Sequence, residues 1–264
     1  MIPPESAAAA GAVAESVRAL QERAARALPA ELVEHADGWW LRHGSGSSWW
    51  VASVLPHGPD APATPAELAR RVARAEEFYA RHGGAARFQI TPSACPAGLD
   101  GLLAGRGYRR SHPVSLQAAA VAGVPGPRAG DRLRVRVEEH PDEAWFGVRH
   151  AVRGTGAGPA ARGRVAGPSA YARVLDGDET VAVGRAVADT GWAGVFAMAT
   201  LPAARGRGAG GRVLGALAGW AGEHGAAHLY LQVERDNPAA LRLYARAGFR
   251  ELCAYHYRTA GAQP

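Results

Sequence analysis

The first half of the chain repeats the order of elements in the later part of the second half. This internal repeat constrains the fold more than any other feature. In the first half, an expected strand ending at Pro56 precedes a helix, a strand, a helix and a closing strand. In the second half, an expected strand ending near Pro202 precedes the same series. Residues 104–108 (AGRGY) and 245–249 (ARAGF) match as well. Alternating strands and helices are typical of α/β and α+β folds, so the sequence predicts two related lobes.

A segment without helix or strand periodicity separates the halves. Residues 121–130 hold two prolines among glycines and alanines, a composition that predicts a linker. We therefore assign residues 1–120 to an N-terminal lobe and residues 131–264 to a C-terminal lobe. In the second lobe we expect strands at 133–138, 171–175, 180–188, 192–201, 228–234 and 249–258, with helices at 141–153, 208–224 and 238–247.

Composition excludes several classes of function. All 30 basic residues are arginine, so neither a Schiff-base lysine nor a Walker-type phosphate loop is possible. The net charge of +6 is spread thinly, which argues against a nucleic-acid partner. Two cysteines are too few for a disulfide scaffold or a metal cluster. The chain has neither a signal-peptide pattern nor a long uncharged apolar stretch, so we expect a cytoplasmic protein without metal or membrane contact.

The segment with the clearest chemistry is residues 200–211, TLPAARGRGAGG, between an expected strand and an expected helix. Glycines permit positive φ and close approach, so the N–H groups from Arg205 to Gly211 can converge on an anion at the positive end of the helix. Arg205 and Arg207 add charge. The corresponding segment of the first half, residues 57–64, has no such pattern. We therefore expect anion binding in the second half only.

Two later features complete a specific pattern. Asn237 begins the next expected helix, and Tyr244 lies two turns further along the same face, before Gly248 and Phe249. The order strand, Arg-x-x-Gly-x-Gly, helix, strand, Asn-x6-Tyr, Gly-Phe resembles the GNAT superfamily of acyl-CoA-dependent N-acetyltransferases over residues 131–258. The first half resembles the truncated, degenerate lobe of tandem GNAT proteins.

The resemblance implies a mixed central sheet whose strands ending at Leu201 and Glu234 splay apart around acetyl-CoA, the cosubstrate. In the family, backbone groups at this strand end hold the pantetheine and the acyl carbonyl, and the glycine-rich loop holds the pyrophosphate. Tyr244 matches the tyrosine that protonates the departing thiolate, and Asn237 matches a residue that hydrogen-bonds the pantetheine. The implied cofactor-binding residues are Ala199, Thr200, Leu201, Arg205, Gly206, Arg207, Gly208, Ala209, Gly210, Asn237 and Tyr244.

The general base does not follow from the resemblance. Some family members carry a glutamate where this chain has Gln232, and an amide cannot accept the amine's proton. Glu234 shares the strand face of Gln232 and is our first candidate, with His150 and His256 as alternatives. We expect transfer of an acetyl group to a primary amine of a small molecule or peptide by direct attack. The alternative is a non-catalytic acyl-CoA-binding regulator or scaffold. Gln232 at the usual position of the base favours this alternative, and the intact Tyr244 favours an enzyme.

Overall fold

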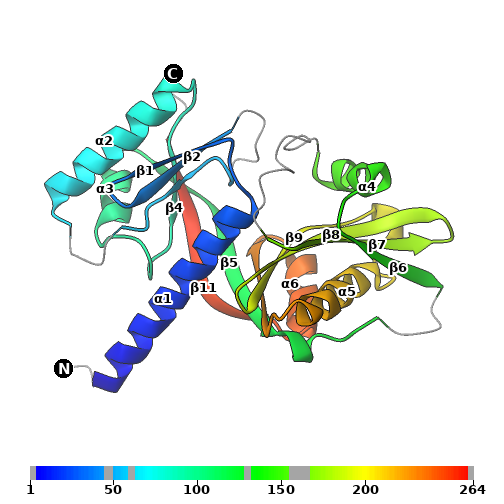
Figure 1. The fold of residues 1–264 in the computed structure, drawn as a ribbon. Helices are drawn as coiled ribbons and strands as arrows, with labels where there is room; N and C mark the ends of the chain where they lie inside the picture. The colour runs from blue at the N-terminus through cyan, green and yellow to red at the C-terminus, as the bar shows by residue number, and fades with distance from the viewer. Residues whose placement is uncertain (1–3, 45–49, 59–62, 128–131, 155–166, 261–264) are drawn as a thin grey trace.

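One mixed sheet runs through both halves of the chain (Figure 1). The computed structural model describes residues 4–44, 50–58, 63–127, 132–154 and 167–260, with side chains from Ser16 onward. Within these residues the sheet has eleven strands in the order β1-β2-β3-β4-β11-β5-β10-β9-β8-β7-β6. No helix of the described residues is long and apolar enough to span a bilayer.

The elements of the two halves follow the expected alternation, with additional elements at the N-terminus. The first half contains α1 (Pro4–Ala27), β1 (Leu32–Ala36), β2 (Trp39–His43), β3 (Val54–Leu55), α2 (Pro65–Arg81), β4 (Arg87–Ile90), α3 (Leu99–Gly105) and β5 (Arg109–Ala120). The second half contains η1 (Val121–Gly123), β6 (Leu133–Glu138), α4 (Glu143–Arg153), β7 (Ser169–Asp176), β8 (Glu179–Asp189), β9 (Trp192–Thr200), η3 (Pro202–Ala204), α5 (Ala209–Glu223), β10 (His228–Glu234), α6 (Pro238–Arg246) and β11 (Arg250–Thr259).

Local sequence explains where the helices begin. Thr64 and Glu67 form a reciprocal capping box at the start of α2, which satisfies backbone donors that the first turn leaves free. Asp142 caps α4 by accepting a hydrogen bond from the Trp145 N–H. Asn237 caps α6 in the same way, and Pro238 occupies the first helical position, where no N–H is needed.

The helices of the second half cover opposite faces of the sheet (Figure 1). Helix α5 packs on one face, where Val213 and Leu217 meet Ala182 and Leu231 in an apolar core. Helix α4 packs on the other face, where Trp145 and Val148 meet Tyr171, Val183 and Ala199. We call these the α5 face and the α4 face.

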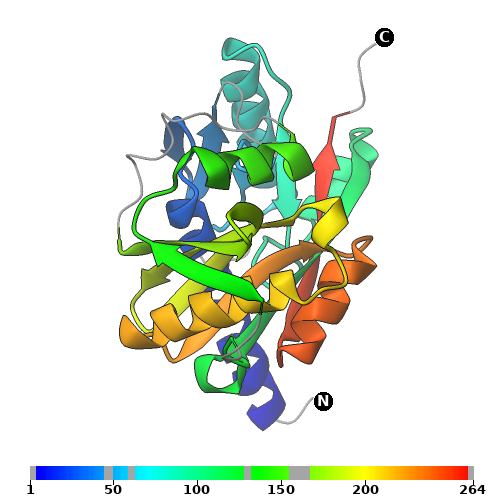
Figure 2. The ribbon, with the colours of Figure 1, turned by 90° about the vertical axis from the view of Figure 1, so that its right-hand side faces the viewer.

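The closing strands of the two halves are exchanged. Strand β5, which ends the first half, pairs antiparallel with β10 of the second half. Strand β11, which ends the second half, pairs antiparallel with both β4 and β5. Figure 2 shows β11 (red) running from beside α6 into the N-terminal half. The 1–120 and 131–264 boundary remains a prediction, but each half places its last strand in the interior of the common sheet.

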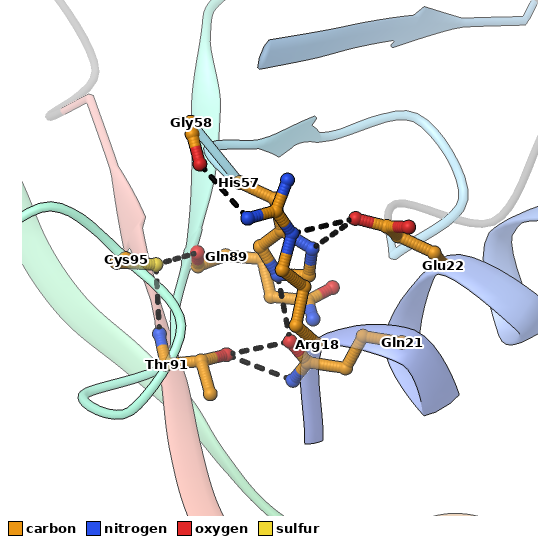
Figure 3. A network of polar contacts seen from close by, with 8 residues as sticks. All are labelled: Arg18, Gln21, Glu22, His57, Gly58, Gln89, Thr91 and Cys95. Atoms are coloured by element: carbon orange, nitrogen blue, oxygen red, sulfur yellow. Dashed lines mark hydrogen bonds and ion pairs between the residues drawn. The ribbon is translucent and has the colours of Figure 1, made fainter. Parts of the chain in front are cut away.

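Helix α1 fastens the two halves together. It meets the first half through a buried polar network, in which the fully buried His57 lies 2.9 Å from Gln21 Oε1 through Nε2 (Figure 3). Gln21 also exchanges hydrogen bonds with Thr91. The helix meets the second half through Arg23, whose Nη1 is 2.8 Å from Asp189 Oδ2. Burial lowers the pKa of His57, against the opposing effect of nearby Glu22.

Candidate active site

Strands β9 and β10 are parallel and pair along only the first part of their length. Their register joins His228 to Trp192, Leu229 to Ala193 and Tyr230 to Gly194. Beyond these pairs the strands continue to Thr200 and Glu234 without a common ladder. Ala197 has a positive φ of 53°, at the irregularity in the β8–β9 pairing, and such a backbone costs about 1–2 kcal/mol in a non-glycine residue. The splayed strand pair that the resemblance implied is therefore confirmed.

The loop after β9 presents free backbone donors at the start of α5. The Arg205 N–H bonds the Pro202 carbonyl at 3.2 Å, and the Arg212 N–H bonds the Gly208 carbonyl at 3.1 Å. The N–H groups of residues 206–211 lie between these two bonded groups, and they have no acceptor among the described residues. Gly206 and Gly208 adopt φ values of +76° and +80°, which favour glycine. With no acidic residue in the first helical turn, the loop is suited to an anion.

The two arginines of this loop differ in their surroundings. Arg207 Nη2 lies 2.7 Å from Asp176 Oδ2, and this hydrogen bond lowers the pKa of the Asp176 carboxyl. Arg205 is exposed and has no ion pair with any described residue. Arg207 thus shares the Asp176 carboxylate with Arg132, whose Nε is 3.0 Å from Oδ1, whereas Arg205 is available to a ligand. The sequence did not distinguish them.

Packing against α6 fixes the position of the loop. A Cβ atom added to Gly210 would lie 3.3 Å from Leu243 Cδ2 and 3.6 Å from Thr200 Oγ1. Little room therefore separates the first turn of α5 from α6 and from the end of β9. A larger side chain at Gly210 would push the donors of the loop away from the splay.

Asn237 caps α6, and Tyr244 lies within this helix. The Asn237 Oδ1 accepts the Ala240 N–H at 3.1 Å, which leaves its amide Nδ2 free to donate. Tyr244 is 6% exposed and packs against Phe249, with ring centroids 5.8 Å apart. Its hydroxyl has no hydrogen bond within the described residues. Burial raises the pKa of Tyr244 to about 12, so the phenol stays protonated at neutral pH.

The base candidates lie in different places. Glu234 is half-buried at the open end of β10, on the α4 face, whereas Tyr244 packs on the α5 face. Gln232, two residues earlier, accepts a short hydrogen bond from the Tyr255 hydroxyl. His150 lies in the last turn of α4, with its ring 5.9 Å from that of Phe146. The structure thus puts Glu234 and Tyr244 on opposite sides of β10.

His256 belongs to a different cluster. It is 4% exposed, pairs with Ile90 of β4, and its Nε2 lies 2.9 Å from Asp100 Oδ1 of α3. Arg258 Nε binds the same Asp100 oxygen at 2.7 Å. His256 therefore fastens β11 to the N-terminal half and is not brought to the splay.

The structure also brings an arginine to the splay, and its contact there could not be predicted from the sequence. Arg153, at the end of α4, donates from Nη2 to the Met198 carbonyl of β9 at 3.4 Å. Its charge contributes to the surroundings of Tyr244. A helix-terminal arginine in an arginine-rich chain carries no local signal of such a contact, because the contact depends on how α4 crosses the sheet.

Comparisons with known proteins agree with this geometry. Residues 14–258 match the family described as probable histone acetyltransferase Rv0428c C-terminal. The uncharacterized N-acetyltransferase YobR of Bacillus subtilis (strain 168) is 26% identical over 258 residues, which cover 92% of this chain and 98% of that protein.

Solved structures share the fold. A GCN5-related N-acetyltransferase from Kribbella flavida has a TM-score of 0.74 at 18% identity, with 96% of each chain covered. A tandem GNAT protein from the clavulanic acid biosynthesis pathway has a TM-score of 0.61 at 17% identity, covering 86% of this chain and 79% of that one.

Proposed function

Because the chain belongs to the Rv0428c C-terminal acetyltransferase family and is a GNAT-type N-acetyltransferase, we propose that its donor is acetyl-CoA and its acceptor a primary amine of a small molecule or peptide. The observation that carries this proposal is the run of free N–H groups at residues 206–211, directly beside the splayed ends of β9 and β10. Family membership also favours an enzyme over the non-catalytic regulator that the sequence left open.

The loop is suited to the pyrophosphate of the cofactor. Backbone donors at a helix N-terminus bind phosphate oxygens without an opposing acid, and Arg205 supplies an uncompensated positive charge. The pantetheine arm would then follow the unpaired edge of β9 at Ala199–Leu201, and Asn237 Nδ2 would donate to it. The loop N–H groups and Asn237 Nδ2 are left free by the described residues, whereas the Leu201 N–H already donates to the Val181 carbonyl at 2.9 Å.

We assign the proton transfers to opposite sides of β10. A neutral amine attacks the thioester carbonyl from the α4 face, the carbon–sulfur bond breaks, and the thiolate takes the Tyr244 proton from the α5 face. Tyr244, with a pKa near 12, is a weaker acid than an exposed thiol near 8.5. Burial beside Tyr244 also raises the pKa of the departing thiol, which reduces this difference in acidity. Glu234 is the proposed acceptor of the amine's proton.

We place the enzyme in the cytoplasm. Its two cysteines, Cys95 and Cys253, are both free thiols, which supports a reducing compartment. Burial raises the pKa of both, as expected for inert thiols that take no part in acyl transfer.

A panel of primary amines tests this function. The protein is incubated with acetyl-CoA and each amine, free thiol is followed with a chromogenic disulfide, and the acetylated amine is identified by mass. We expect at least one amine to accelerate thiol release with equal formation of its acetylated product. Release that no amine accelerates, although acetyl-CoA binds, would leave the proposed acceptor class without support.

A further inference from the structure

Two arginines on neighbouring strands are almost equally buried but differ in their acidic partners. Arg173 of β7 is 9% exposed, and Arg185 of β8 is 8% exposed. Arg173 forms ion pairs with two carboxylates, those of Glu138 at 2.8 Å and of Asp142. A buried cation with two such partners is compensated, and its role in the fold is clear.

Arg185 has no such compensation. Its Nη2 is 3.4 Å from Ser169 Oγ, and its guanidinium lies over the Tyr171 ring at 5.4 Å from the centroid. Its Nε is sealed from solvent without a hydrogen-bond partner, as is the Nε of Arg173, but no carboxylate of the described residues pairs with Arg185. An unpaired buried charge costs folding free energy, which a bound ion of opposite charge would offset.

Arg185 lies beside the splay, on the side where we place the acceptor. It pairs in register with Phe196, the residue before the Ala197 irregularity of β9. It shares the α4 face with Tyr171 and Val183, whereas the start of α5 and the anion-binding loop belong to the opposite face. The cofactor's pyrophosphate on that loop is therefore not the missing partner.

Two further arginines on this face lack an acidic partner among the described residues. Arg149 and Arg153 of α4, which crosses β8 and β9 on this face, form no ion pair with a carboxylate of the described residues. Their mutual repulsion adds to burial in lowering the pKa of Arg149. The α4 face beside the splay thus carries three arginines that no carboxylate of the described residues pairs with, while Glu234 lies further along, at the open end of β10.

We propose that Arg185 binds an anionic group, a carboxylate or a phosphate, on the amine acceptor. The proposal rests on the acetyl-transfer function above and narrows its acceptor to acidic amines. The guanidinium fork binds such groups by paired hydrogen bonds, and the Tyr171 ring beneath it keeps the fork in place. Binding at this site would hold the amine near the point where β9 and β10 begin to separate.

Matched amines test the proposal. One pair is β-alanine and 3-aminopropanamide, which differ in the carboxylate. The other is O-phosphoethanolamine and ethanolamine, which differ in the phosphate. We compare kcat/KM of the wild-type enzyme, Arg185→Gln and Arg185→Lys for each amine. Since the amine's own pKa is the same for every enzyme, it cancels in the ratio of wild type to variant.

We expect Arg185→Gln to lower kcat/KM for one acidic amine at least tenfold more than for its neutral partner, the scale of a lost charged hydrogen bond. Arg185→Lys should restore part of the difference. The pair of amines that is affected shows whether the site binds a carboxylate or a phosphate. Arg173→Gln is the control, because Arg173 is almost as buried as Arg185. This substitution should lower the melting temperature and should change kcat/KM by the same factor for acidic and neutral amines. Equal effects of Arg185→Gln on both members of both pairs would overturn the proposal.

An equilibrium measurement separates this proposal from the function on which it rests. The same four amines are titrated by calorimetry into wild type and Arg185→Gln, each saturated with CoA, so that no turnover occurs. If no amine is acetylated, the acceptor class proposed for the enzyme fails, but tighter binding of an acidic amine to wild type than to Arg185→Gln would still support the anion site. Absence of that difference would overturn it.

Discussion

Replacing Tyr244 by phenylalanine removes one hydroxyl from the splay and tests the proposed general acid. The hydroxyl has no hydrogen bond within the described residues, so its removal leaves no buried donor or acceptor unsatisfied. The ring contact with Phe249 is kept. We therefore expect an unchanged melting temperature and acetyl-CoA affinity within a few-fold of wild type. A positioned general acid contributes roughly 10²-fold to the rate, so kcat should fall by that factor, or about 2.7 kcal/mol in activation free energy.

The pH profile gives an independent check. Because burial raises the pKa of Tyr244 to about 12, the phenol is protonated throughout roughly pH 6 to 9. The loss caused by Tyr244→Phe should therefore be equal at every pH in that range. Initial rates of thiol release at saturating acetyl-CoA measure it. Tyr230→Phe is the control, because Tyr230 is also a buried tyrosine but lies where β9 and β10 are still paired. An unchanged kcat in Tyr244→Phe would mean that water protonates the thiolate and would refute the assignment.

Three further predictions concern the cofactor, the base and the α1 network. Wild type should bind one equivalent of acetyl-CoA by calorimetry, and Gly208→Glu with Gly210→Glu should abolish binding; two equivalents, or binding that survives, would contradict a single loop site. Glu234→Gln should lower kcat/KM at neutral pH, with a loss that shrinks toward pH 9 as more amine is already neutral, whereas a loss independent of pH would remove Glu234 as the base. Burial lowers the pKa of His57 in the folded protein. As the pH falls below about 6.5, His57 therefore binds a proton in the unfolded chain before it does in the folded one, so stability should fall from pH 7 to 5. Melting temperatures should therefore depend less on pH in His57→Gln than in wild type or in the exposed-site control His224→Gln, and an equal slope would refute this coupling.

Local sequence was sufficient wherever a backbone conformation decides the site. The glycines of the loop, the Asn237 cap and the spacing to Tyr244 act within one or two turns of their own position, so the sequence predicted their placement. The resemblance also predicted the splay of β9 and β10, because the splay depends on the order of the strands in the sheet.

Features that depend on distant partners could not be predicted in the same way. The exchange of β5 and β11 was not visible, since periodicity indicates which face of a strand is buried but not which strand lies beside it. Helix α1 is held by polar contacts such as Gln21 with Thr91, far away in the sequence. The unpaired charge of Arg185 appears only when Arg173, on the neighbouring strand, takes the available carboxylates.

A crystal structure with bound acetyl-CoA tests the central claim most directly. We predict pyrophosphate oxygens within hydrogen-bond distance of the N–H groups of residues 206–211, and the thioester between the separated ends of β9 and β10, beside the Tyr244 hydroxyl. A cofactor held elsewhere, with those N–H groups still without an acceptor, would contradict the claim.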